Sequence, residues 1–229
     1  MAQVSSSDRE RRGLAGAFAL CSLATLTLLA SHPSSSARTL AEVLREEAHG
    51  VWINGVVHGG FIITLAALMV CFILLSRLLG SHRVSVAIAL TAFCIGSGLL
   101  IASMILDGFV TPALAIRFAD SGNADNLTMA RTLFILCGTV ISFLMPIGML
   151  FQSTAILGWS SAMVKGPGMR RGVGAFGLAA GVILIIGLLA GPPALKPHLL
   201  LAGIALQAIW YLALAALLGS GASWPVAER

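Results

Sequence analysis

The sequence predicts an all-α integral membrane protein, a bundle of six transmembrane helices with both ends in the cytoplasm and short helices on the outer surface. Two observations support this fold class. Hydrophobic residues make up 58% of the 229 positions and charged residues only 10%, whereas a soluble globular domain carries about 25% charged residues. The charges also cluster between apolar runs of roughly 18 to 25 residues, the length of helix that crosses about 30 Å of hydrocarbon.

The apolar runs divide the chain into six expected spans within a single membrane domain, residues 1–229. The expected spans are about 13–31, 51–76, 84–106, 132–152, 172–190 and 198–219. Pro146 lies inside the fourth span, where we expect it to kink the helix. The longest polar stretches are residues 31–50 and 107–131. A soluble catalytic domain does not fit into either, so any chemistry must come from the helices or from these two segments.

The distribution of basic residues predicts the orientation. With the N-terminus inside, the inner segments hold nine of the 14 Lys and Arg residues and the outer segments hold five. Cytoplasmic segments are enriched in Lys and Arg, so this count favours N-in and C-in in a bacterial-type inner membrane. The same bias accounts for the net charge of +5. We therefore expect the lipid bilayer as the partner of this chain, and no nucleic acid. In an alternative interpretation residues 1–37 are a signal peptide cleaved after Ser35-Ser36-Ala37, which leaves five helices.

Two outer segments carry the signals of short helices. Thr39 and Glu42 have the spacing of a capping box, in which each side chain bonds an amide that the helix start leaves unpaired. We therefore expect a surface helix leading into the second span. Thr111-Pro112 has the pattern of an N-cap followed by proline in the first turn. A second short helix is expected there through about residue 119, with Leu114 and Phe118 facing lipid.

Small residues recur at four-residue spacing in the fifth span. Gly177, Gly181, Gly187 and Gly191 form two such pairs, and glycine at this spacing lets two helices approach closely in a membrane. We expect packing within the bundle, with homo-oligomerisation through these glycines as the alternative. Two further patterns concern the cysteines and a possible repeat. The four cysteines lie in apolar spans and are expected to be packing residues. Spans one and two also share short sequence patterns with spans five and six. We favour chance over a true internal repeat as the origin of this similarity.

The rare ionisable residues in or near the spans collect on the outer side. His58 lies about two turns into the second span, Asp107 closes the third and His198 opens the sixth; His49 and Glu46 lie on the expected surface helix. Ionisable groups in a membrane are costly and therefore mark candidate functional sites. Imidazoles and carboxylates are ligands of divalent transition metals, so all five residues are candidate metal ligands. His58 and His198 on facing helices could alternatively bind haem iron.

These residues lead to three functional hypotheses. We favour a membrane-embedded binding or accessory subunit whose outer His/Asp site holds a metal ion or haem. The first alternative is a transporter or channel for a small solute or ion, and the second is an enzyme that acts on a lipid with His and Asp as acid and base. The sequence contains no HExxH, GxSxG or Walker A motif, so hydrolytic and phosphate-binding classes have no support.

Overall fold

The computed structural model describes residues 6–32, 39–119, 123–190 and 196–221. Every regular element in these ranges is helical, which confirms the predicted all-α class. In chain order the elements are α1 (Ser6–Ala30), α2 (Leu40–His49), α3 (Val51–Leu79), α4 (Val84–Ile105), the π-helix η1 (Leu106–Val110), α5 (Thr111–Phe118), α6 (Ala124–Met163), α7 (Gly168–Ala190) and α8 (Lys196–Gly219). The predicted cleavage sequence Ser35-Ser36-Ala37 lies outside the described residues.

Six helical stretches in the described part are long and apolar enough to cross a membrane. They are Asp8–Ala30, Val51–Leu79, Val84–Phe118, Ala124–Met163, Gly168–Ala190 and His198–Gly219. Their lengths of 22 to 40 residues compare with the roughly 20 apolar residues that a bilayer core requires. The chain thus has the architecture of a multi-pass membrane protein.

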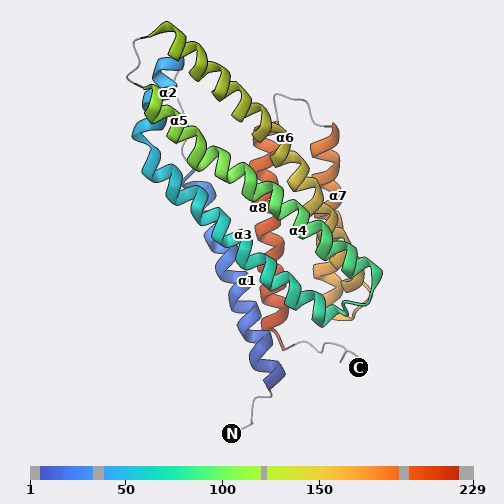
Figure 1. The fold of residues 1–229 in the computed structure, drawn as a ribbon. Helices are drawn as coiled ribbons and strands as arrows, with labels where there is room; N and C mark the ends of the chain where they lie inside the picture. Colours follow the sequence, from blue (N-terminus) through green and yellow to red (C-terminus); the bar gives the residue numbers. More distant parts are fainter. Residues whose placement is uncertain (1–5, 33–38, 120–122, 191–195, 222–229) are drawn as a thin grey trace.

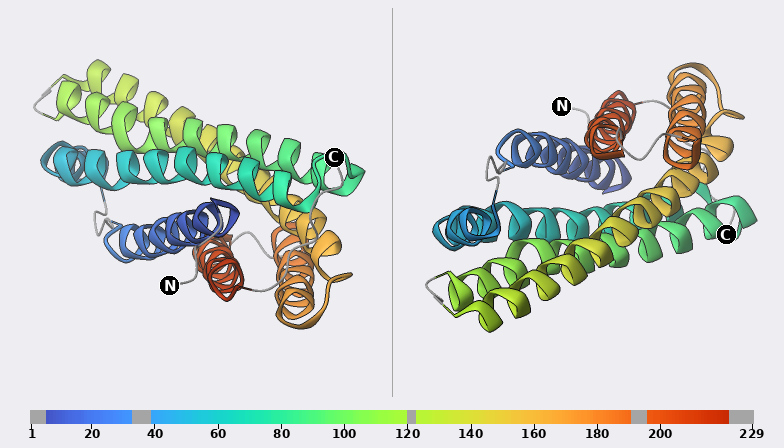
Figure 2. Two further views of the ribbon diagram at one scale, coloured as in Figure 1. Left: turned by 90° about the horizontal axis from the view of Figure 1, so that it is seen from below. Right: turned by 90° about the horizontal axis from the view of Figure 1, so that it is seen from above.

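The helices form two groups that face each other (Figures 1 and 2). The first group contains α3, the continuous α4–η1–α5 segment and the first half of α6. The second contains α1, α8 and α7, with α1 packed along α8. The helix α6 packs against α4 and α7, so it connects the two groups. In Figure 1 the start of α1 and the end of α8 lie at the same end of the bundle, and α2 lies at the opposite end.

An aromatic cluster fills the half of the bundle nearer the start of α1. Phe72 stacks on Trp159, with ring centroids 4.1 Å apart and planes 9° from parallel. Phe18 meets the Phe72 ring edge-on at 5.0 Å. The indole N–H of Trp159 donates a 2.9 Å hydrogen bond to Ser76 Oγ, which pairs a polar group that neither lipid nor core could satisfy. This half of the bundle is therefore densely packed.

Two of the glycines singled out in the sequence are close-contact positions within the bundle. A Cβ on Gly177 would overlap Ser160 Oγ of α6 and Trp210 Nε1 of α8, and one on Gly181 would lie 2.7 Å from Leu157 Cδ2. Both therefore let α7 approach its neighbours in the same chain. Among the residues that the structure describes, Gly187 has only Leu199 Cδ2 within 4 Å, at 3.8 Å, and Gly191 lies outside the described residues.

The first outer helix is confirmed as α2. The Thr39 side chain accepts from the Glu42 amide and the Glu42 carboxylate accepts from the Thr39 amide, which completes the predicted capping box. Leu44 on its inner face is fully buried. It packs with Ala115, Phe118 and Ala130 in a small apolar cluster beneath α2.

The prediction for the second outer helix is wrong in two respects. Thr111 is not an N-cap, because its backbone is helical and α4 continues through η1 into α5 without a break. Phe118 does not face lipid, because it is 7% exposed and packs beneath α2. The physical reason lies in Pro112, which has no N–H for the carbonyl of Gly108 and crowds it. The helix widens into a π turn there, and both the amide and the hydroxyl of Thr111 donate to the Leu106 carbonyl, so the helix bypasses the proline without ending.

The helix α6 extends well beyond the expected fourth span of residues 132–152. Its 40 residues correspond to about 60 Å of helix. The Asn123 side chain caps its start by accepting from the Asp125 amide. Pro146 lies inside the helix and does not end it.

Candidate metal centre

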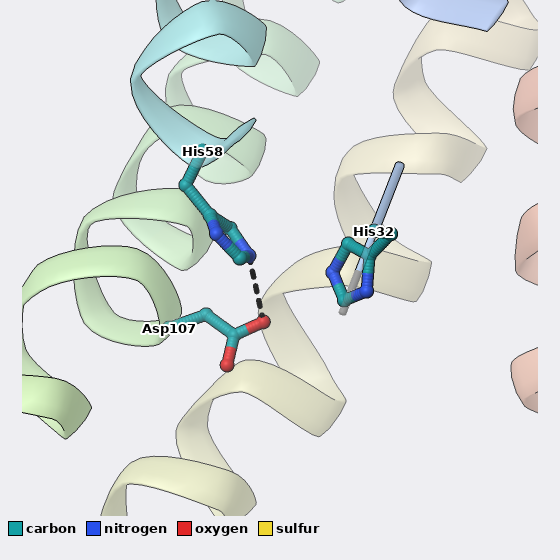
Figure 3. A group of neighbouring side chains, drawn as sticks. All are labelled: His32, His58 and Asp107. Carbon is teal, nitrogen blue, oxygen red and sulfur yellow. Dashed lines mark hydrogen bonds and ion pairs between the residues drawn. The ribbon is translucent and has the colours of Figure 1, made fainter. Parts of the chain in front are cut away.

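Three elements bring an imidazole pair and a carboxylate together near the α2 end of the bundle. His32 lies two residues beyond the end of α1, His58 about two turns into α3, and Asp107 in η1. One ligand atom of each residue lies within 4.8 Å of the other two (Figure 3). Figure 3 shows the His58 ring and the Asp107 carboxylate directed toward each other, with the His32 ring facing both. The group therefore combines residues 32, 58 and 107 from three separate parts of the chain.

His58 is the buried member of the group, with 2% of its surface exposed. Its Nδ1 lies 2.9 Å from the backbone carbonyl oxygen of Asn54, and its Nε2 lies 3.1 Å from Asp107 Oδ2. A carbonyl can only accept, so Nδ1 carries the proton. In a neutral imidazole Nε2 is then an acceptor as well, and it faces a carboxylate oxygen that can only accept when ionised. A positive charge, either a proton or a metal ion, is needed between these two atoms.

The close approach of η1 to α3 depends on Gly108. A Cβ at this position would overlap Cβ and lie 2.5 Å from Cγ of His58, so no other residue fits without a shift of the helices. The π turn also contributes, because a π turn adds one residue to the helix and rotates the following side chains by about 100°. Gly108 therefore sets how closely the turn that carries Asp107 approaches His58, and the π turn sets the rotation of α5 relative to the Asp107 carboxylate.

His32 was not identified from the sequence. Its ring centroid lies 5.1 Å from that of His58, at an interplanar angle of 70°. His32 is exposed and 37% of the Asp107 side chain is exposed, so the group is open on one side. One signal could have identified it: His32 directly follows the first span, on the same predicted side of the membrane as Asp107.

Glu47 and Asn54 form a second layer around His58. Asn54 Nδ2 donates a 2.7 Å hydrogen bond to Glu47 Oε2, and the carbonyl of the same Asn54 accepts from His58. Burial raises the pKa of the Glu47 carboxyl, and the negative charge of Asp107 raises it further. Glu47 therefore ties the surface helix α2 to α3 one turn before His58.

The structure brings together only two of the five residues proposed from the sequence as metal ligands, His58 and Asp107. His49 is exposed, and its Nδ1 lies 2.8 Å from the Arg45 carbonyl. Glu46 is exposed on α2, and His198 is exposed near the start of α8. Among the residues that the structure describes, none of these three belongs to the His32–His58–Asp107 group.

A partly open cavity adjoins this group. Its volume is about 300 Å³, and its walls come from α1, α3, α4, η1, α6 and α8. His32 and Asp107 are among the lining residues, as are Gln207 and Tyr211 of α8. Whatever occupies the cavity therefore meets the His/Asp group at one end.

Comparisons with known protein families, with curated proteins and with solved structures find no match to this chain. The features that bear on its function are thus its own: six helices able to cross a membrane, a His/His/Asp group, and the cavity beside it.

Proposed function

We propose that this chain is a membrane-embedded binding protein that holds one divalent transition-metal ion between His32, His58 and Asp107. The observation that carries the proposal is the convergence of three ligand atoms within 4.8 Å. The hydrogen bonds of His58 also support the proposal. Nδ1 donates to the Asn54 backbone carbonyl, so in a neutral imidazole the lone pair is on Nε2, which faces Asp107. A metal ion between Nε2 and the carboxylate would supply the positive charge that this arrangement needs.

The ligand set favours particular metals. Two imidazoles and one carboxylate suit Zn²⁺ or Fe²⁺ better than Ca²⁺ or Mg²⁺, which prefer oxygen ligands. Three protein ligands leave at least one coordination position for water or a bound molecule, as in catalytic zinc sites and non-haem iron sites. This choice of ligands fits a site that binds or activates something more than it fits a purely structural site.

The surroundings of His58 resemble those of metal-binding histidines. Such a histidine commonly donates its second N–H to a carbonyl or carboxylate, which fixes the ring and its tautomer. Here the Asn54 carbonyl takes that role, and Glu47 holds the Asn54 side chain. Changes in such partners cost about 10- to 100-fold in metal affinity.

The haem form of the proposal has less support. It needs two imidazoles on either side of an iron, and the sequence suggested His58 with His198. His198 is exposed and lies outside the group around His58. We therefore propose a metal ion in place of haem.

We place the chain in a bacterial-type inner membrane with both ends in the cytoplasm. The support is the excess of Lys and Arg in the segments that would then be inside. In this orientation α2 and the His/Asp group lie at the outer face, so the metal would be loaded from outside the cell membrane.

Proton-coupled transport is the second candidate. A proton shared between His58 and Asp107 would satisfy the same geometry, and buried His/Asp pairs in membranes serve as proton relays. The cavity next to the pair is the observation that favours it. A metal titration separates the two candidates.

The deciding experiment is calorimetric titration of Zn²⁺ and of Fe²⁺, the latter without oxygen, into the chelator-treated protein in mild detergent. We expect about one ion per chain. We expect H58A and D107N to lose at least about 100-fold in affinity, more than the loss from changing a residue that only supports a metal ligand. H198A serves as the matched control and should bind like the unaltered protein. Equal binding by H58A and the unaltered protein would contradict the metal site and favour the proton-coupled candidate.

A further inference from the structure

The cavity between the two helix groups has the size and composition of a ligand site. Its volume of about 300 Å³ equals that of about ten water molecules in the liquid and lies at the lower end of small-molecule pockets. Most of its lining is apolar, including the three methionines Met104, Met145 and Met149. A few polar side chains in a mainly apolar wall are typical of sites that bind lipophilic molecules.

The cavity is elongated along the helices. On α3 it runs from Phe61 to Leu68, and on α8 from Leu200 to Tyr211. At 1.5 Å per residue these stretches cover about 10 Å and about 16 Å. One end lies beside His32 and Asp107, and the other extends past Gln207 to Tyr211, near the middle of the α8 span.

Gln207 provides a second observation that points to a ligand. It lines the cavity and is 4% exposed, and its Nε2 has no hydrogen-bond partner among the residues that the structure describes. Gln152, which also lines the cavity, donates from its Nε2 to Ser97 Oγ at 3.2 Å. An unpaired amide N–H inside a membrane protein is costly. An oxygen atom of a bound molecule would pair it.

The charges of the lining restrict the ligand. No Lys or Arg is among the described residues that line the cavity, and Asp107 is the one carboxylate. An anionic head group would meet no positive side chain there and would face Asp107. These charges disfavour an anion, and the mainly apolar wall favours an uncharged molecule over any ion.

We propose that this cavity binds a neutral lipophilic molecule with a carbonyl or ether oxygen, which accepts a hydrogen bond from Gln207 Nε2. The apolar body lies between the methionine and leucine side chains, and the opposite end lies next to His32 and Asp107. This inference does not rest on the metal site, because Gln207 and the methionines are outside the His/Asp group.

Photolabelling with benzophenone tests the proposal on the full chain in phosphatidylcholine nanodiscs. Benzophenone is an uncharged lipophilic ketone whose excited carbonyl inserts into nearby C–H bonds, methionine being a favoured target. We expect peptide mass spectrometry to find the label on Met104, Met145 and Met149, well above the level on Met129. Met129 is 57% exposed and does not line the cavity, so it reports simple partition into lipid.

Competition in the unaltered protein tests the ligand class without any variant. An excess of 2-undecanone should reduce labelling of the three methionines, whereas undecane and undecanoate at the same concentration should reduce it much less. Labelling of the cavity methionines no greater than that of Met129 would overturn the proposal. Equal competition by undecane would overturn the hydrogen bond to Gln207.

Two variants and one matched control locate the binding. I204W fills the cavity and should abolish the labelling, whereas I209W places the same side chain on the exposed face of α8 and should leave it unchanged. Q207L should lower labelling about five- to tenfold, the effect of one lost hydrogen bond. Labelling that survives in a correctly folded I204W, judged by size-exclusion chromatography, would place the label elsewhere and overturn the site.

Discussion

At the scale of single residues, the contact between His58 and Asp107 limits what the site can hold. Two hydrogen-bonding constraints act on one imidazole: the Asn54 carbonyl fixes the proton on Nδ1, and the Asp107 oxygen lies 3.1 Å from Nε2. Since neither oxygen can donate when Asp107 is ionised, the pair requires a cation.

Glu47 allows a prediction about pH. Its carboxyl has a raised pKa in the folded protein, mainly through burial, so the folded state holds this proton more tightly than the unfolded chain. The resulting stability is complete below the ordinary pKa of 4.5 and is lost as the pH rises through the raised value. We expect E47Q, which still accepts from Asn54, to match the unaltered protein near pH 4 and to exceed its melting temperature at pH 7.

Thermal unfolding in detergent with a chelator present checks this expectation. The matched control is E46Q, on the neighbouring exposed residue of α2, which should leave the pH dependence unchanged. A melting temperature of E47Q that follows that of the unaltered protein at both pH values would show that Glu47 is not destabilised by its surroundings.

Gly108 gives a second prediction at this scale. An added methyl group overlaps the His58 side chain, and overpacking of this kind costs about 1 to 3 kcal/mol. We expect G108A to lower both the stability in detergent and the affinity for Zn²⁺, because the shift separates η1 from α3. G98A in α4, where a Cβ meets no described residue within 4 Å, should change neither. Tight Zn²⁺ binding by G108A would mean that the close approach is not needed for the site.

At the scale of elements, the π-helix η1 determines where Asp107 is placed. The π turn rotates α5, which packs beneath α2, by about 100° relative to its place in a regular α-helix, so Asp107 and α5 keep a different mutual orientation from the one a regular helix would give. Pro112 favours the π turn because it cannot pair the Gly108 carbonyl. This element shows how one proline at position 112 acts on a carboxylate at position 107.

Replacement of this proline is the test of that role. We expect P112A to restore a regular α-helix over residues 106–112 and to weaken Zn²⁺ binding by about tenfold, within the range for indirect effects on metal ligands. Calorimetry gives the affinity, and circular dichroism confirms that the helix content is kept. P146A in α6 is the control, because Pro146 lies in a different helix. Unchanged affinity in P112A would show that the π turn persists without the proline or does not position Asp107.

At the scale of the whole molecule, the two helix groups give the chain a densely packed end and an end with a cavity. The aromatic cluster around Phe72 fills the first, and the His/Asp group adjoins the cavity at the second. The proposed orientation puts the packed end toward the cytoplasm and α2 outside, which labelling can test.

We predict the result of labelling intact cells with a membrane-impermeant maleimide. In a variant whose four cysteines are replaced by serine, H49C on α2 should react from outside, whereas S81C in the turn after α3 should react only after the cells are opened. Both side chains are exposed in the folded chain, so burial does not explain a difference. The reverse pattern would place the His/Asp group on the cytoplasmic side.

The sequence alone determined the features that depend on composition and local spacing. Apolar runs of sufficient length predicted six helices, and the Thr39–Glu42 pair predicted the start of α2, because a capping box is formed by neighbouring residues. The rarity of ionisable groups in lipid also pointed to His58 and Asp107. These inferences needed no knowledge of which helices are neighbours.

The tertiary structure alone decided which of the candidate residues meet. His32 and Glu47 are distant in sequence from His58 and Asp107 and carry no motif, while His49 and His198 have suitable chemistry but lie outside the His/Asp group. The π turn before Pro112 changed the course of the third span, since a proline can end a helix or be bypassed depending on the packing around it. A binding site depends on the distances between helices. Those distances follow from side-chain packing across the whole bundle, and the close contact of Gly108 with His58 is one part of that packing.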